Sequence, residues 1–196
     1  MINRLTICRL GILTIVLCLL SSSGKAQDNV PRSDTFDDVM QYVPYAAVIT
    51  LKGAGVESKG SWPQLLTAVA SSYLVTAGTT YILKHTIHHT RPDGSDRRSF
   101  PSGHAAISFA GAQTLHRQYG HVSPWISVGG YVVATATAID RVARDRHHWY
   151  DVAAGAAIGV ASAELGHWLS KKLFPNQSAC TVNISPMGLN VMLNIK

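Results

Sequence analysis

Three short stretches decide how this sequence is read: residues 84–92 are KHTIHHTRP, residues 101–104 are PSGH, and residues 141–151 are RVARDRHHWYD. Each stretch alone has an ordinary explanation. Basic residues near a helix end are commonly solvated, a Ser-Gly-His turn is a common loop, and a histidine four residues before an aspartate is commonly a structural pair on a helix. The three stretches become informative about function because they occur together and in this order.

The segments around these stretches predict helices. The run from Pro63 to Lys84 has no charged residue before the lysine, and Pro124 opens a second uncharged run. Helices are expected at about Phe36–Leu51, Pro63–Lys84, Ala105–Tyr119, Pro124–Ile139 and His148–Leu173, with a loop at His89–Gly103 that contains prolines and glycines. The sequence therefore predicts an all-α fold, a compact bundle of about five to six helices.

The C-terminal tail has a different pattern. From Thr181 onward apolar and polar residues alternate, with a break at Pro186–Gly188, and this alternation is typical of a short β strand or hairpin. Gly155 and Gly159 stand four residues apart in the last expected helix, a spacing that lets another helix approach closely. Ordinary small-residue packing is sufficient to explain them.

The N-terminus has the features of a secretory signal. Arg4 and Arg9 give a positive start, Leu10–Leu20 is uncharged and apolar, and Gly24 and Ala26 provide the small residues of a cleavage site. An uncleaved anchor helix is the alternative. The predicted organisation is thus a signal peptide at 1–26, a helical domain at 27–175 and a β-like tail at 176–196.

The positions of the basic residues along the sequence are more informative than the net charge. The chain carries a formal +6, but after removal of Arg4, Arg9 and Lys25 the remaining 14 basic residues face 11 acidic ones. This excess is too small to indicate nucleic acid, and none is expected as a partner. The basic residues between positions 84 and 146, which outnumber the acidic ones there, are Lys84, Arg91, Arg97, Arg98, Arg117, Arg141, Arg144 and Arg146. Their grouping favours a local anion site.

In order and spacing the three stretches match K-x6-RP, PSGH and R-x5-H-x3-D without a gap. The chain in this respect closely resembles the type 2 phosphatidic acid phosphatase superfamily, which includes bacterial acid phosphatases, lipid phosphate phosphatases and vanadium haloperoxidases. The resemblance covers about residues 36–172 in helix layout and 84–151 in motif. One difference is visible, because Asp140 stands where the family usually has a serine before its arginine.

A phosphoryl group in transfer spreads negative charge over its oxygens, so its stabilisation requires fixed donors. Lys84, Arg91 and Arg141 are expected to supply charge, and the two arginines can bind oxygens bidentately. Ser102 and the backbone N–H of Gly103 stand just ahead of an expected helix, where hydroxyl and amide donors can face an anion.

Three further residues are assigned to the chemistry, and the resemblance implies the same roles. His147 is the expected nucleophile, which would form a phosphohistidine. Asp151, four residues later, is expected on the same helical face and would accept the Nδ1 proton of His147. His104 is the expected general acid, which protonates the leaving alkoxide and then activates water. His148 is expected to point elsewhere.

The family reaction needs neither metal nor cofactor, and none is predicted. His85, His88 and His89 have a spacing that could suggest a metal site, but no neighbouring carboxylate or cysteine in the sequence completes one, so they are interpreted as polar residues at a helix end.

The substrate follows less directly from the sequence. The long uncharged segments favour membrane contact and a lipid-linked phosphate such as lipid A, an isoprenoid pyrophosphate or phosphatidylglycerophosphate, cleaved on the periplasmic side of a bacterial inner membrane. The alternative is a soluble periplasmic acid phosphatase that accepts small esters, in line with a mean hydropathy of only +0.12. A vanadium haloperoxidase and a non-enzymatic binder of anionic lipid remain as further classes.

Overall fold

The computed structural model describes residues 38–175, 180–185 and 188–193. In this part of the chain the helices of 11 or more residues are α3 (Val43–Gly53), α4 (Trp62–Thr86), α5 (Gly103–Tyr119), α6 (Pro124–Ala143) and α7 (Trp149–Leu173). A helical turn at residues 38–40 precedes α3. The predicted all-α bundle is confirmed. The predicted signal peptide, residues 1–26, lies outside the described residues.

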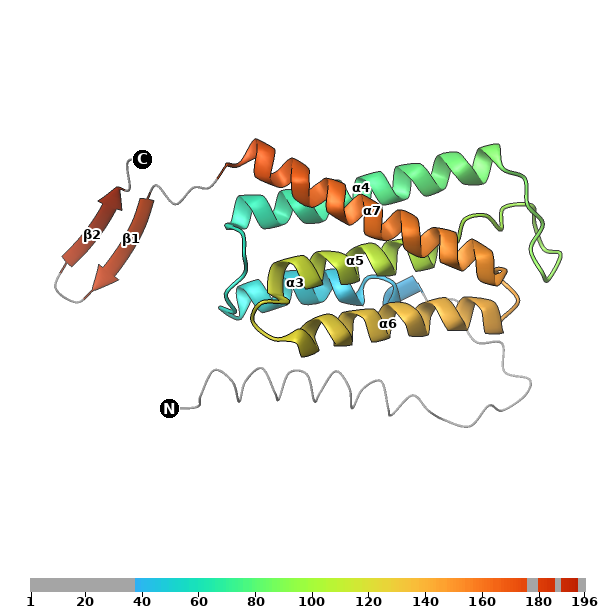
Figure 1. The fold of residues 1–196 in the computed structure, drawn as a ribbon, viewed down its shortest axis with the longest axis horizontal. Coiled ribbons are helices and arrows are strands. Elements are labelled where there is room, and N and C mark those ends of the chain that lie inside the picture. The colour runs from blue at the N-terminus through green and yellow to red at the C-terminus, as the bar shows by residue number, and fades with distance from the viewer. Residues whose placement is uncertain (1–37, 176–179, 186–187, 194–196) are drawn as a thin grey trace.

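Helix α5 is the centre of the bundle. It contacts α3, α4, α6 and α7, and most of its side chains are buried. Figure 1 shows the helices running roughly along the long axis, with α7 crossing α4. The residues that begin α5 are therefore surrounded by the other helices.

Proline explains most helix starts, including one that the sequence prediction placed wrongly. Pro63 and Pro124 lie in the first turns of α4 and α6, where a missing N–H costs little. The helix expected from Phe36 is interrupted, because α3 begins only at Val43, one residue before Pro44, after a turn at residues 41–42. The short turn at 38–40 is thereby separated from α3.

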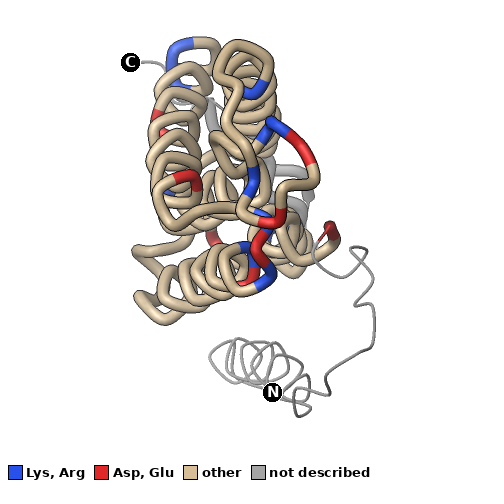
Figure 2. Tube along the Cα trace, turned by 90° about the vertical axis from the view of Figure 1, so that its right-hand side faces the viewer, with Lys and Arg blue, Asp and Glu red and all other residues tan. Residues whose placement is uncertain are grey.

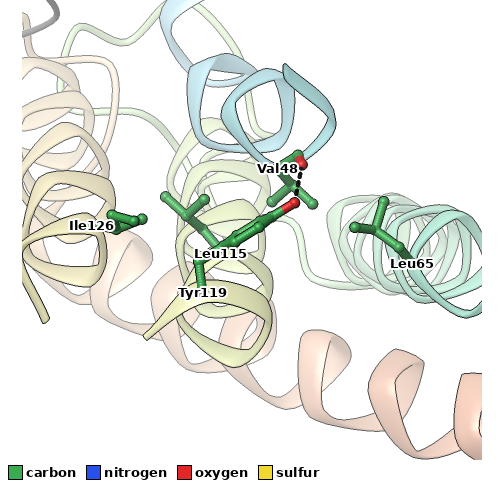
Figure 3. Packing of buried hydrophobic residues seen from close by; sticks show 5 residues of the cluster. All are labelled: Val48, Leu65, Leu115, Tyr119 and Ile126. Carbon is green, nitrogen blue, oxygen red and sulfur yellow. Dashed lines mark hydrogen bonds between the residues drawn. The ribbon is translucent and has the colours of Figure 1, made fainter. Parts of the chain in front are cut away.

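A small hydrophobic cluster holds four of the helices together. It contains Val48 of α3, Leu65 of α4, Leu115 and Tyr119 of α5, and Ile126 of α6 (Figure 3). The Tyr119 hydroxyl donates to the Val48 carbonyl oxygen at 2.8 Å, so the buried phenol is also satisfied as a hydrogen-bond donor. Burial of each of these side chains contributes about 1.5–3 kcal/mol.

Glycines on α7 permit its close approach to neighbouring helices. A Cβ built on Gly155 would overlap the carbonyl oxygen of Ser102, and one built on Gly159 would overlap that of Ala106. The expected small-residue packing is therefore present. It places the first turns of α7 directly against the start of α5, where PSGH lies.

The alternating tail forms a two-stranded antiparallel hairpin. Strand β1 (Cys180–Ser185) pairs with β2 (Gly188–Leu193), with a register that runs from Cys180 opposite Leu193 to Ser185 opposite Gly188. The helical bundle holds all of the motif residues.

Candidate active site

The three motif stretches meet at one end of the bundle. Helices α4 and α6 end there and α5 and α7 begin there (Figure 1). Figure 2, which looks from that side, shows charged residues along the loops at this end. The residues predicted for the site occupy these helix ends and loops: Lys84, Arg91, Ser102, Gly103, His104, Arg141, His147 and Asp151.

The first candidate hydrogen-bond donors to a bound anion lie where the end of α4 meets the start of α5. The Lys84 Nζ donates to the carbonyl oxygen of Arg98 at 2.8 Å. A Cβ added at Gly103 would lie 3.8 Å from the Lys84 Cε, so the lysine side chain passes directly beside the first residue of α5. This places an ammonium next to a helix N-terminus, and both favour an anion.

Ser102 is the N-cap of α5 and is fully buried. Its Oγ accepts a long hydrogen bond of 3.5 Å from the Ala105 backbone N–H, and its own backbone N–H donates to the Asp151 carbonyl oxygen at 3.0 Å. Since the cap uses the hydroxyl as an acceptor, its proton can be donated to a bound anion.

Arg91 is held in place by Asp96. Its Nε donates to the Asp96 Oδ1 at 2.8 Å, and its backbone N–H donates to the Asp96 carbonyl oxygen at 3.0 Å. Burial by itself would raise the pKa of Asp96, but the hydrogen bonds from Arg91 and from the Arg98 backbone lower it. Because this pair uses Nε, the terminal guanidinium nitrogens can be directed at an anion.

His147 is buried, with 2% of its side chain exposed. Burial, followed by the positive charges of Lys84, Arg91 and Arg141, lowers the pKa of His147 to about 3. All three predicted cations therefore act on one imidazole. That imidazole is neutral at neutral pH, as a nitrogen nucleophile must be.

The structure changes the expected contact between His147 and Asp151. His147 precedes α7 and its N-cap, His148, so the histidine and the aspartate do not share a helical face. The His147 Nδ1 lies 4.0 Å from the Asp151 Oδ2, beyond hydrogen-bonding distance. The prediction of a direct Nδ1 hydrogen bond is thus wrong for this structure, although the two groups are neighbours.

The Asp151 carboxylate instead serves other donors. Fully buried, its Oδ2 accepts from the Ser99 Oγ at 2.5 Å and from the His148 backbone N–H at 2.9 Å, and the His148 Nδ1 lies 3.2 Å away. The expectation that His148 points elsewhere is therefore wrong. As the third residue of α7, Asp151 caps the helix while it lies beside His147.

His104 lies in the first turn of α5 with its Nε2 2.8 Å from the Asp38 Oδ1. Burial and then the charge of Arg141 lower the pKa of His104, whereas the hydrogen bond and charge of Asp38 oppose that shift. Arg141 is almost fully buried in the last turn of α6 and so acts on both histidines.

Asp140 forms an ion pair with Arg144 one turn later, with 3.7 Å between carboxylate oxygen and guanidinium nitrogen. Where the family usually has a serine, this chain thus carries a carboxylate partnered on its own helix.

Three residues offer metal-ligand atoms close together. Ligand atoms of His89, His148 and Asp151 all lie within 4.8 Å of one another, and two imidazoles with a carboxylate are a common zinc set. The same groups already have protein partners, since the His89 Nε2 lies 3.2 Å from the Tyr150 hydroxyl and His148 contacts Asp151. His85 and His88 are exposed, as expected for a helix end.

Four positions that sequence reasoning did not select contact the site residues: Asp38, Asp96, Ser99 and His148. Asp96 and Ser99 lie inside the predicted loop, and a search for partners of Arg91 and Asp151 there would have found them. No sequence signal indicates Asp38, which stands 66 residues from His104.

Comparison with known proteins gives a consistent result. The sequence profile of the PAP2 superfamily matches residues 64–175. The Lipid A 1-phosphatase of Porphyromonas gingivalis is 40% identical over 161 residues, which is 82% of this chain and 34% of that protein, so the chain spans about a third of the length of the curated relative it matches. The crystal structure of Aquifex aeolicus LpxE has the same fold, with a TM-score of 0.54 at 19% identity over 71% of this chain and 87% of that one.

Proposed function

The chain belongs to the PAP2 superfamily, and we propose on that premise that it is a phosphatase that removes phosphate from a membrane lipid through a phosphohistidine on His147. The observation that carries the proposal is the convergence of Lys84, Arg91 and Arg141 on one buried, neutral imidazole. Such a group of cations can bind a phosphate next to a nucleophile.

The proposed reaction has two steps. A ring nitrogen of His147 attacks phosphorus, the bond from phosphorus to the ester oxygen breaks, and His104 gives its proton to the departing alkoxide. Water then attacks phosphorus, the bond from phosphorus to the His147 nitrogen breaks, His104 accepts the proton of that water, and inorganic phosphate leaves. The three cations stabilise the charge on the phosphoryl oxygens in both steps, together with Ser102 and the Gly103 N–H.

Exposed apolar surface supports a lipid substrate. Helices α4 and α7 are each long and apolar enough to cross a membrane. In the most apolar 18-residue stretch of each helix, only 28% and 39% respectively is buried inside the bundle. The core helix of a soluble protein, by contrast, is mostly buried. Large apolar side chains that point outward on three helices are Leu66, Leu74, Tyr81, Ile82, Val128, Val132, Ile139, Leu165 and Leu173. Hydrocarbon is the solvent that suits these faces.

Among lipid phosphates, lipid A 1-phosphate is the first candidate, because the Porphyromonas gingivalis relative is a Lipid A 1-phosphatase. The deciding experiment measures phosphate release by the detergent-purified protein from lipid A, an isoprenoid pyrophosphate, phosphatidylglycerophosphate and p-nitrophenyl phosphate. Turnover of a lipid at least tenfold faster than of the small ester supports the proposal. The reverse preference would favour the soluble acid phosphatase.

The covalent step has its own test. Rapid quenching in alkali with labelled substrate should trap phosphate on the protein, and His147→Ala should trap none and lose about 10⁴-fold or more of kcat. His121→Ala is the matched control, since His121 is exposed in the turn between α5 and α6, at the opposite end of the bundle. Wild-type turnover in His147→Ala would end the phosphohistidine proposal.

The two remaining classes make different predictions. A haloperoxidase would oxidise halide when vanadate and peroxide are added, and vanadate would then activate the protein. In the proposed phosphatase vanadate inhibits, because it binds to the same cations as the phosphoryl group. A non-enzymatic lipid binder would retain phosphorylated lipid without releasing phosphate.

A further inference from the structure

The contact between Asp38 and His104 joins two distant parts of the chain at the site. The carboxylate oxygen lies 2.8 Å from the imidazole Nε2, within hydrogen-bonding distance, and the side chains are 59% and 21% exposed respectively. Asp38 sits on the helical turn at 38–40, and the Gln41 side chain donates to its carbonyl oxygen at 3.0 Å. Gln41 is itself buried, so the turn is fastened to the bundle.

On the basis of the proposed phosphatase reaction, we propose that Asp38 is the positioning residue of the general acid: it binds the Nε2–H of His104 and leaves Nδ1 to carry the proton exchanged with the leaving group and with water. The carboxylate fixes the rotation of the ring. It also stabilises the imidazolium, the form that the first step requires.

The charges around His104 show why a partner is needed. Burial is the largest factor that disfavours protonation of His104, and the charges of Arg141 on α6 and Lys84 on α4 act in the same direction. The hydrogen bond and the charge of Asp38 act in the opposite direction and favour protonation of His104. The cations that bind phosphate thus work against the general acid, and Asp38 offsets part of their effect.

The Asp38 carboxylate is expected to affect the pH dependence of kcat/KM through the pKa of His104. His104 must be protonated to act as an acid, so kcat/KM falls as pH rises through the pKa of His104. Loss of the Asp38 charge removes an interaction that favours the proton, so the pKa falls further and the alkaline limb of the profile moves to lower pH. Activity below that limb depends less on the carboxylate.

The test uses Asp38→Asn in the full chain, with Asp38→Glu as the conservative variant. Asp38→Asn should move the alkaline limb of kcat/KM to lower pH and lose on the order of tenfold at pH 8, since each 1.36 kcal/mol of lost interaction is a factor of ten. Asp38→Glu should restore most of the limb. The matched control is Glu57→Gln, which removes one exposed carboxylate in the loop between α3 and α4, at the far end.

A second readout does not depend on activity. Titration of ¹⁵N-labelled histidines by NMR, with the His104 resonance assigned through His104→Gln, should show a lower pKa for His104 in Asp38→Asn than in the wild type. An unchanged pH profile together with an unchanged His104 titration would overturn the role of Asp38. If the wild type releases no phosphate, the proposed function fails, and the titration still decides whether the pair exists.

Discussion

Ser99 links the loop before PSGH to the carboxylate beside the nucleophile. Its side chain is fully buried and donates to the Asp151 Oδ2 at 2.5 Å, while its backbone N–H donates to the His89 carbonyl oxygen at 2.9 Å. The serine therefore sets the position of the carboxylate that neighbours His147. A hydroxyl bound to a charged acceptor contributes about 1.5–3 kcal/mol.

Ser99→Ala should accordingly lower kcat by about 10- to 100-fold with little change in helix content, because the backbone hydrogen bond remains. Ser95→Ala is the control, since Ser95 is exposed on the same loop. Steady-state kinetics on the preferred lipid decide the matter, and equal kcat values for the two variants would show that the Ser99 hydroxyl has no role in turnover.

The charges of the proposed anion site come from side chains, so chelators should leave activity unchanged. The measurement is phosphate release after dialysis against EDTA, compared with untreated protein. The informative alternative is activity that falls and returns with Zn²⁺, because His89, His148 and Asp151 have the ligand types of a zinc site. His89→Gln would then abolish the zinc response.

At the scale of elements, the approach of α7 to α5 depends on glycine. Around Gly159 the nearest atoms belong to the backbone of α5, the Ala106 carbonyl oxygen and the Ala110 nitrogen, and backbone cannot move aside as a flexible side chain can. Any side chain at this position must push the two helices apart. The N-terminus of α7, with Asp151, would then move relative to PSGH.

Gly159→Ala should therefore lower Tm by roughly 2–10 °C, which corresponds to about 1–3 kcal/mol of overpacking. Gly129→Ala on α6 is the matched control, because nothing lies within 4 Å of its added Cβ, and it should leave Tm unchanged or raise it slightly. Thermal unfolding followed by circular dichroism in one detergent compares the two, and equal Tm values would contradict the tight contact.

At the scale of the whole molecule, exposed tryptophans lie at both ends of the bundle, with Trp149 at the start of α7 on the site end and three others at the opposite end. Trp62 and Trp125 lie in the first turns of α4 and α6, Trp168 lies near the end of α7, and all three are exposed. Lys52 and Lys172 lie over the rings of Trp62 and Trp168, at 5.9 and 5.0 Å from the ring centroids. Tryptophan is typical of both interfaces of a membrane, so exposed tryptophans at the two ends fit a bundle whose ends lie at the two interfaces.

The proposed orientation has the site end in the periplasm, with its basic residues retained there for the anion, against the usual preference of basic residues for the cytoplasmic side. A cysteine at Ser95, in a background without Cys8, Cys18 and Cys180, should react in intact cells with a thiol reagent that crosses the outer but not the inner membrane. Glu57→Cys, at the opposite end, should react only after the inner membrane is broken. The reverse pattern would place the site in the cytoplasm and remove periplasmic lipids from the candidate substrates.

Local sequence was sufficient to predict most of the helices and to select motif residues that lie together at one end of the bundle. Uncharged runs that begin at Pro63 and Pro124 predicted α4 and α6 because helix starts and apolar faces are local properties. The spacing from Lys84 to Asp151 selected residues that the fold gathers at one end, since each stands at a helix terminus or in the loop beside it. Helix starts and helix ends can be predicted from a few turns of local sequence.

The hydrogen-bond partner of each site residue depends on how the helices pack. The pairing of Asp38 with His104, and of Ser99 with Asp151, spans 66 and 52 residues, and such pairings depend on how helices pack. The start of α7 at Trp149 makes His148 the N-cap, so His148 contacts Asp151 through the capping box, whereas the His147 Nδ1 lies 4.0 Å from the carboxylate. Local pattern fixes periodicity, whereas contact between distant residues is set by packing of the whole bundle.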